Sequence, residues 1–101
     1  VDEYLELVGR LKGLDRANAL ASANEMIEAV NLNQVARRPI HKLSKGFRQR
    51  VGLAQAFVGK PKLVILDEPT VGFDPQQNNE FRKLLKKYQG TCTIIWSTHI
   101  L

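Results

Sequence analysis

Apolar residues recur at helical spacing through the N-terminal part of the chain. They predict a first helix over residues 1–12, because its apolar positions share one stripe. This stripe comprises Val1, Tyr4, Leu5, Val8 and Leu11. Gly13 is expected to end the helix, since glycine readily adopts the left-handed conformation of a helix C-terminus. A second helix is predicted from the N-cap Asp15 to about Val30. Its expected buried face consists of Leu20, Ala23, Ile27 and Val30.

The middle of the chain changes from an aperiodic connector into a third predicted helix. Residues 31–41 have no sustained period and contain Pro39, which indicates a connector. Ser44 is a suitable N-cap for a helix to about Val58. The apolar stripe of this helix comprises Phe47, Val51, Ala54 and Val58. The start of the helix offers a hydroxyl, Gly46, unpaired N–H groups and the positive end of a dipole. It is therefore either an anion site or a simple capped helix.

Two adjacent acids follow an apolar run in the second half of the chain. Residues 63–66 are Leu-Val-Ile-Leu, which is typical of a parallel strand buried on both faces. Pro69 cannot continue the strand, so the strand is expected to end at Asp67 and Glu68. Ligands of open α/β sheets bind at this edge, beyond the carboxyl ends of the strands. The acids therefore predict either a Mg²⁺ site for phosphoryl transfer or a solvated acidic turn.

The C-terminal part predicts a loop, a helix and a second strand. Residues 69–75 contain two prolines and a glycine, which indicate a loop, and Asp74 before Pro75 is either a turn residue or the N-cap of the following helix. One face of this helix carries Phe81, Leu84, Leu85 and Tyr88. Gly90 is expected to end the helix, and residues 91–96 are expected to form a buried strand. A lone histidine, His99, follows this strand and is either structural or functional. It shares an edge with the acids if the helix is a right-handed crossover between parallel strands.

Composition limits the class of protein. The 101 residues suffice for one domain at most, and 44% hydrophobic and 25% charged residues are usual for a globular chain. No apolar run approaches the roughly 20 residues of a membrane span. Cys92 has no partner for an intrachain disulfide and is expected to be a small core residue.

The net charge of +5 reflects two basic clusters. Such clusters are either solvated helix faces or contacts for phosphates. The clusters comprise Lys42, Lys45, Arg48 and Arg50, and Arg82, Lys83, Lys86 and Lys87. Aromatic residues do not alternate with these charges, so a platform for stacking nucleic-acid bases is not expected.

Four motifs resemble, in order and spacing, those of the ABC (ATP-binding cassette) ATPases. LSKGF at residues 43–47 resembles the signature motif, and LVILDE at 63–68 resembles the Walker B strand with its catalytic glutamate. VGFD at 71–74 resembles the D-loop, and STH at 97–99 resembles the switch-histidine loop. The helices of residues 1–30 are similar to the helical subdomain of the family. The resemblance implies an α/β fold: a partial P-loop NTPase-like domain with a helical subdomain, followed by parallel strands with a crossover helix.

The signature departs from the common LSGGQ. Lys45 stands in place of the first glycine and Phe47 in place of the glutamine, whereas Ser44 and Gly46 remain. An LSKG signature followed by Gln-Arg at residues 49–50 resembles the ATPase subunits of bacterial ABC-2-type exporters.

The chain contains no G-x-x-x-x-G-K-[ST] sequence. The resemblance therefore concerns only the C-terminal part of a nucleotide-binding domain, and the Walker A part is expected upstream of Val1. Residues 1–42 are expected to be a portion of the helical subdomain. Residues 43–101 are expected to hold the signature helix and the Walker B, D-loop and switch-histidine part of the core. The intact chain is then expected to be an ATPase, and the 101-residue segment alone to be inactive.

The resemblance implies a role for each matched residue. Asp67 would hold Mg²⁺, and His99 would contact the γ-phosphate of ATP. Glu68 would act as general base or would orient the attacking water. Asp74 would link the two sites of a dimer across its interface. The signature residues would close over the ATP of the opposite subunit. The expected nucleotide-binding residues are Ser44, Lys45 and Gly46 of the signature, together with Asp74.

The resemblance also implies partners. They are a second nucleotide-binding domain, in a homodimer, and a membrane-spanning permease subunit, which would hold the protein on the cytoplasmic face of the cell membrane. The expected function is to power transport through ATP-driven dimerisation. A soluble, non-transport ABC ATPase and a non-hydrolysing regulatory fragment are the alternatives. No nucleic acid is expected as a partner.

Overall fold

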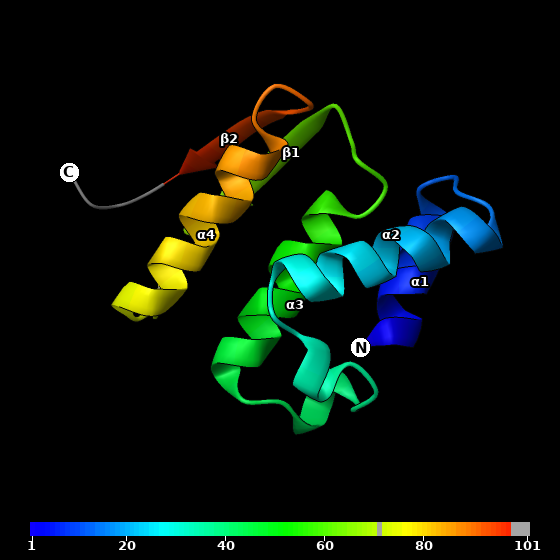
Figure 1. Cartoon of the computed structure of the whole chain (residues 1–101), viewed down its shortest axis with the longest axis horizontal. Coiled ribbons are helices and arrows are strands. Elements are labelled where there is room, and N and C mark those ends of the chain that lie inside the picture. Colours follow the sequence, from blue (N-terminus) through cyan, green and yellow to red (C-terminus); the bar gives the residue numbers. More distant parts are fainter. Residues whose placement is uncertain (71, 98–101) are drawn as a thin grey trace. The chain divides into compact units, whose positions relative to one another are not determined.

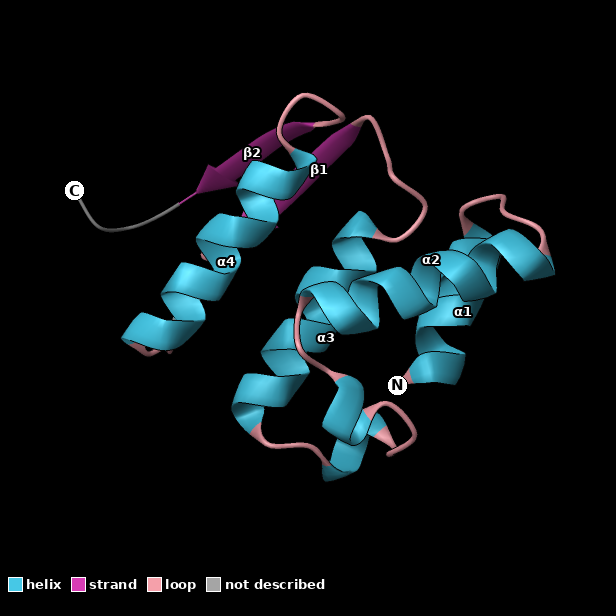
Figure 2. Cartoon of the chain, in the orientation of Figure 1, coloured by secondary structure: helices cyan, strands magenta, loops and turns pink. Residues whose placement is uncertain are grey.

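The structure is a computed structural model that describes residues 1–70 and 72–97. The chain divides into two compact units, Val1–Gly59 and Lys60–Leu101. We call the first the helical unit and the second the strand unit. Figures 1 and 2 show that helices build the first and that the second adds two strands. The predicted α/β class is confirmed. The functional division predicted at residue 43 stays a prediction.

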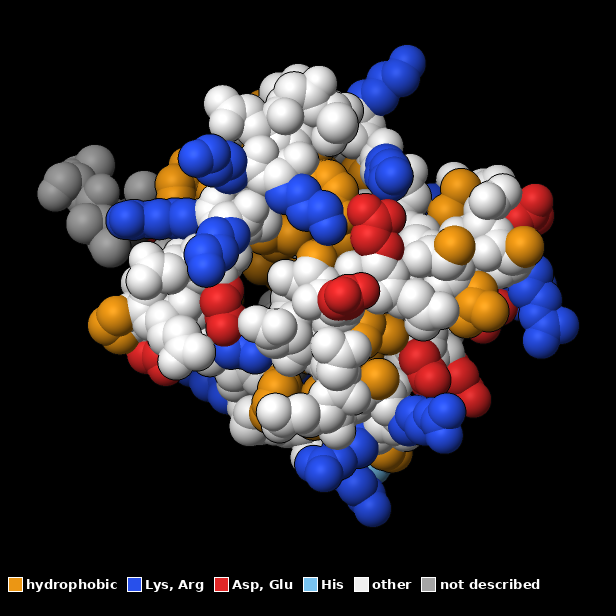
Figure 3. Space-filling model, viewed as in Figure 1, with side chains coloured by type: hydrophobic (Ala, Val, Ile, Leu, Met, Phe, Trp, Pro, Cys, Tyr) orange, Lys and Arg blue, Asp and Glu red, His pale blue; other side chains and the backbone are white. Residues whose placement is uncertain are grey.

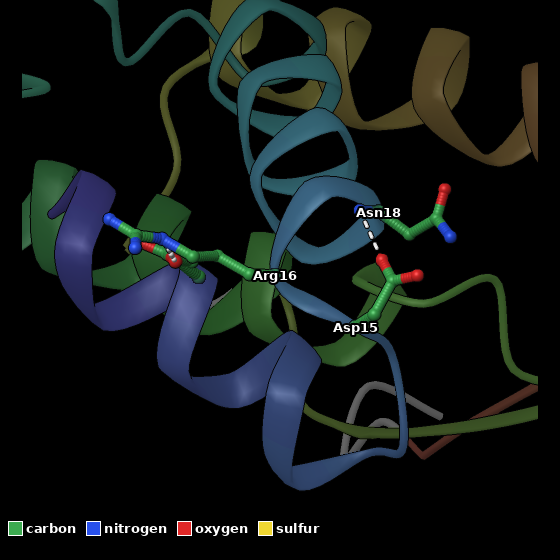
Figure 4. A network of polar contacts seen from close by, with 4 residues as sticks. Asp15, Arg16 and Asn18 are labelled. Atoms are coloured by element: carbon green, nitrogen blue, oxygen red, sulfur yellow. Dashed lines mark hydrogen bonds and ion pairs between the residues drawn. The ribbon is translucent and has the colours of Figure 1, made fainter.

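Three α-helices build the helical unit. They are α1 (Asp2–Leu11), α2 (Arg16–Ala29) and α3 (Lys45–Phe57). Gly13 ends α1 with a φ of 100°. The Asp15 carboxylate caps α2 by accepting a hydrogen bond of 2.8 Å from the N–H of Asn18, as Figure 4 shows. The predicted helix end at Gly13 and the predicted N-cap at Asp15 are both confirmed.

Small residues determine how α1 packs on α2. A Cβ on Gly9 would lie 3.1 Å from the Cβ of Ala19, so the two helices approach closely at this point. Ala19 is completely buried, whereas Leu11 is 78% and Leu20 is 46% exposed. The predicted burial of Leu20 is therefore wrong, and Leu11 is exposed although it belongs to the predicted apolar stripe of the first helix. The predicted stripes consisted mainly of large apolar residues. They left out Gly9 and Ala19, whose small size lets the two helices approach closely.

The connector between α2 and α3 belongs to the core of the helical unit. It contains two 3₁₀ helices, η1 (Asn33–Val35) and η2 (Ile40–Lys42), which the sequence did not predict. Leu32 and Val35 are buried, at 0% and 2% exposure. Two apolar residues three positions apart are too few to define a period, and for this reason the pattern missed them.

The C-terminal end of α3 is hydrogen-bonded to residues at the end of α1 and within α2. Lys12, just beyond α1, donates hydrogen bonds of 2.7 Å to the Gln55 carbonyl and 2.9 Å to the Val58 carbonyl. The Gly59 N–H donates to the Ser22 hydroxyl of α2 at 2.9 Å. An ammonium group at this end satisfies free carbonyls and complements the helix dipole. Burial lowers the pKa of the Lys12 amino group below its ordinary value of 10.5.

We expect Lys12→Met to lower the free energy of unfolding of the helical unit by about 1 kcal/mol. Methionine keeps the apolar stem but leaves the carbonyls at the end of α3 without their charged donor. Urea denaturation of the intact protein, followed by circular dichroism, measures the change. Arg10→Met is the matched control, since Arg10 is exposed in the last turn of α1. Equal effects of the two substitutions would show that the hydrogen bonds of Lys12 add nothing.

The strand unit joins two parallel strands through one helix. These elements are β1 (Leu63–Asp67), α4 (Pro75–Tyr88) and β2 (Thr93–Ser97). The strands are hydrogen-bonded neighbours with Asp67 opposite Ser97, which confirms the predicted parallel pairing. The helix covers one face of the sheet (Figure 1), and the ring centroids of Phe81 and Trp96 lie 5.4 Å apart.

Only one face of β1 is buried. Val64 and Leu66 are 2% and 7% exposed, whereas Leu63 and Ile65 are 49% and 70% exposed. The prediction of a strand buried on both faces is therefore wrong for the part of the chain that the structure describes. The alternation follows from the strand period of two, which turns successive side chains to opposite faces while α4 covers one.

None of the helices within residues 1–70 and 72–97 is long and apolar enough to cross a membrane.

The Lys and Arg side chains on the face shown in Figure 3 extend outward from the surface, as expected for solvated charges. Cys92, the expected core residue, is half-buried, and its thiol is 3.7 Å from the Tyr88 carbonyl.

Candidate functional site

The two acids lie where β1 ends, as predicted. Asp67 is the last residue of the strand and Glu68 is the first residue beyond it. Glu68 has a φ of 47°, a left-handed conformation that is uncommon for a residue with a side chain. This conformation costs about 1 to 3 kcal/mol and persists only where neighbouring contacts maintain it. The chain therefore makes a sharp, strained bend at the second acid.

Ser97, at the end of β2, bonds to both acidic positions. Its hydroxyl donates a hydrogen bond of 2.6 Å to Oδ1 of Asp67. Its carbonyl accepts one of 3.0 Å from the N–H of Glu68. In the sequence STH at residues 97–99, a role was predicted only for His99 and none for Ser97. The only available signal was its position at the end of the second predicted strand, opposite the acids.

Asp74 begins α4 through a reciprocal capping box. Its carboxylate accepts 2.8 Å from the N–H of Gln77, and the Gln77 side chain accepts 3.0 Å from the Asp74 N–H. The preceding Phe73 donates its N–H to the Thr70 carbonyl at 3.0 Å. Its ring packs edge-on against Phe81 of α4, with centroids 6.3 Å apart. Of the two predicted roles of Asp74, turn residue or N-cap, the structure shows the N-cap.

Ser44, Lys45 and Gly46 form the start of α3 in the helical unit. The Ser44 hydroxyl accepts a hydrogen bond of 3.3 Å from the N–H of Phe47, which confirms the predicted cap. The first N–H groups of a helix have no carbonyl partner within it, so those of Lys45 and Gly46 point outward from this end. Ser44 and Lys45 are exposed. The guanidinium of Arg50 lies 5.5 Å from the centre of the Phe47 ring, which places a positive charge beside the first turn of α3.

The candidate residues fall into two groups that belong to different units. Asp67, Glu68 and Asp74 lie in the strand unit, together with Ser97. The residues at the start of α3 lie in the helical unit: Ser44, Lys45 and Gly46. His99 lies outside the described residues, as does Val71 of the D-loop motif. The role of His99 therefore stays a prediction.

A groove of about 610 Å³ runs between α4 and β2 on the strand unit. Its lining includes Arg82 and Lys86 from the helix and Ile94 and Trp96 from the strand. None of the acids that the motifs single out contributes to it, so the groove is separate from the candidate site.

Known proteins match this chain along most of its length. The sequence model of the family described as ABC transporter matches residues 2–71. The ABC transporter ATP-binding protein YxlF of Bacillus subtilis is 38% identical over 100 residues, which are 99% of this chain and 34% of YxlF. The linearmycin resistance ATP-binding protein LnrL of the same organism is 36% identical over 98% of this chain and 32% of its own length. The human phospholipid-transporting ATPase ABCA7 is 40% identical over 100% of this chain and 5% of its own length.

The chain thus spans about a third of the length of the two bacterial relatives that it matches. The matched segment of residues 2–71 includes the sequences LSKGF at 43–47 and LVILDE at 63–68. The match covers more than half of the chain, and we therefore conclude that the chain belongs to the ABC transporter family.

Proposed function

We propose that the intact protein is the ATP-binding and ATP-hydrolysing subunit of an ABC transporter. It powers transport across a membrane through ATP-driven dimerisation. The observation that carries this proposal is the pair Asp67 and Glu68 at the carboxyl end of β1, beside the end of the parallel strand β2. This is the edge at which α/β proteins bind nucleotides. The match to the ABC transporter family and to ATP-binding relatives supports ATP as the nucleotide.

Asp67 is proposed to hold Mg²⁺. The described ranges 1–70 and 72–97 contain no cluster of three or more His, Cys, Asp or Glu that could hold a metal ion by itself. Mg²⁺ needs no such cluster, because it uses one or two carboxylates together with waters and substrate phosphates. The exposed carboxylate of Asp67 fits this donor set. When bound, the ion would neutralise charge on the transferred phosphoryl group.

Glu68 and His99 are proposed as the catalytic residues. Glu68 would accept a proton from the attacking water or orient that water, and its bend at φ 47° turns the chain at this point. His99 follows β2 by two residues and would contact the γ-phosphate. Phosphoryl transfer depends mainly on positioning and charge neutralisation, which these groups can supply.

Ser44, Lys45, Gly46 and Asp74 are proposed to act across a homodimer. The start of α3 offers N–H groups and a hydroxyl, the usual components of an anion site. In a head-to-tail dimer it would close over the γ-phosphate of the partner's ATP, and Asp74 would connect the two sites. ATP then stabilises the closed dimer and hydrolysis releases it, so the subunit can drive a population shift in a membrane partner.

The proposed membrane partner is a permease subunit at the cytoplasmic face of the cell membrane, in an exporter. The family match and the LSKG sequence at residues 43–46, which resembles that of bacterial ABC-2-type exporters, support this assignment. A soluble ABC ATPase or a non-hydrolysing regulatory protein would be the conclusion if the tests below fail. No nucleic-acid partner is proposed.

The deciding experiment is Mg-ATP hydrolysis by the intact protein, beside its Asp67→Asn variant and the 101-residue segment. We expect turnover in the intact protein and none in the segment, which contains no G-x-x-x-x-G-K-[ST] sequence. Asp67→Asn removes the charge that attracts the cation. We therefore expect it to raise the Mg²⁺ concentration needed for half-maximal turnover by about tenfold or more. A folded, ATP-binding intact protein without turnover would favour the regulatory alternative.

A further inference from the structure

Ser97 lies opposite Asp67 on the neighbouring strand and is hydrogen-bonded to both acidic residues, and the motifs assign it no role. We propose that Ser97 is the positioning residue of this acidic pair: its hydroxyl orients the Asp67 carboxylate for the cation while its carbonyl holds the bend at Glu68. The inference rests on the proposed function, in which Asp67 holds Mg²⁺.

The hydroxyl of Ser97 fixes one oxygen of the Asp67 carboxylate. The hydrogen bond from Oγ to Oδ1 is 2.6 Å long, within the range of short bonds from hydroxyls to ionised carboxylates. In the part of the chain that the structure describes, Ser97 is the one side chain bonded to this carboxylate. A carboxylate held at one oxygen keeps a fixed direction for the other oxygen. The rotation of Asp67 about its side-chain bonds is therefore restricted before any cation arrives.

The backbone of Ser97 fixes the neighbouring acid. Its carbonyl accepts the N–H of Glu68 at 3.0 Å, one residue beyond the ladder that pairs Asp67 with Ser97. This bond continues the β1–β2 pairing into the residue with φ 47°. It offsets part of the strain of the left-handed conformation. Ser97 thus fixes the orientation of the Asp67 side chain and the backbone conformation of Glu68.

The two contacts respond differently to substitution. Every residue supplies a backbone carbonyl, so a change at position 97 preserves the bond to Glu68 and removes only the hydroxyl. Partners that orient a metal-binding carboxylate typically change metal affinity by 10- to 100-fold when removed. The metal-dependent part of ATP binding should therefore change while metal-free ATP binding does not.

The test uses the intact protein with Mn²⁺ as the probe in place of Mg²⁺. Binding of Mn²⁺·ATP is titrated through the water proton relaxation of the bound ion, and binding of metal-free ATP is measured in EDTA. We expect Ser97→Ala to weaken Mn²⁺·ATP binding about tenfold and to leave metal-free ATP binding unchanged. Thr93→Ala is the matched control, since Thr93 is exposed on the same strand but pairs with Leu63, away from the acids.

A second pair of variants keeps the test decisive if Ser97→Ala fails to fold. Ser97→Thr and Ser97→Val introduce side chains of nearly equal shape, and only threonine carries a hydroxyl. We expect the threonine variant to bind Mn²⁺·ATP as the unmodified protein does and the valine variant to bind about tenfold more weakly. Equal binding by the two variants would overturn the inference.

Asp67→Asn separates failure of the inference from failure of the proposed function. If Asp67→Asn weakens Mn²⁺·ATP binding and Ser97→Val does not, Asp67 holds the cation without help from Ser97, and only the inference is wrong. If Asp67→Asn itself leaves Mn²⁺·ATP binding unchanged, the metal-binding role of Asp67 is wrong, and the inference fails with it.

Discussion

Replacing Glu68 with Gln is expected to reduce Mg-ATP turnover by the intact protein by about 100-fold or more, without weakening ATP binding. A positioned general base contributes typically 10²- to 10⁴-fold to a rate, and an amide cannot accept the proton at neutral pH. Glutamine has nearly the same shape as glutamate, so the bend at φ 47° and the N–H bond to Ser97 should persist. Steady-state phosphate release measures turnover, and equilibrium titration with labelled ATP measures binding.

Glu28→Gln provides the control for the Glu68 experiment. Glu28 is an exposed residue of α2, and its substitution removes the same charge far along the chain from the acidic pair. We expect this variant to hydrolyse ATP at the unmodified rate. Normal turnover in Glu68→Gln would contradict the assignment of Glu68 as base. Equal losses of ATP binding and turnover in that variant would indicate a folding defect instead.

Helix starts and breaks were the most predictable part of the fold. Asp15, Ser44 and Asp74 each cap a helix in the structure, through a hydrogen bond to the N–H three residues further on. Such a bond depends on a stretch of four residues, so a single sequence contains everything that determines it. Gly13 and Gly90 likewise adopt the positive φ values expected where a helix ends.

Packing between distant segments was less predictable. Leu11 was on the predicted apolar stripe of the first helix and Leu20 on the predicted buried face of the second. In the structure, Gly9 and Ala19 occupy the contact between α1 and α2. The period of a helix defines several possible stripes, and the partner helix selects among them. That choice depends on the shapes of two surfaces that meet, which the spacing within either helix does not contain.

The same distinction applies to the candidate site. Asp67 and Glu68 were evident because they follow an apolar run and precede Pro69. Ser97 was not evident, because its bond to Asp67 joins residues 30 positions apart and depends on the register of β1 against β2. A shift of one residue would turn the serine to the other face of the sheet. Its role could therefore be inferred only from the register.

Replacing Ser44 with Arg is expected to prevent the ATP-driven dimerisation of the intact protein. Ser44 is exposed at the start of α3, the surface proposed to close over the partner's ATP. Arginine is too large for a closed interface at this position, and it places a cation at the positive end of the helix dipole. Glu68→Gln serves as the background, since slow hydrolysis should preserve the ATP-bound dimer. Multi-angle light scattering should give the mass of a dimer for Glu68→Gln with ATP and that of a monomer for the double variant.

Ser44→Thr distinguishes a blocked interface from a lost helix cap. Threonine keeps the hydroxyl that accepts the N–H of Phe47 and is nearly as good an N-cap as serine. It adds one methyl group where arginine adds a long charged chain, so we expect ATP to dimerise Ser44→Thr in the same background. Loss of a cap alone costs about 1 kcal/mol and should appear as a lower unfolding temperature, with or without ATP. An ATP-dependent dimer of unchanged mass in the Ser44→Arg variant would contradict the placement of the α3 start at the nucleotide interface. A monomer in that variant, with normal binding of ATP, would mean that Ser44 acts in closure and not in the initial capture of nucleotide.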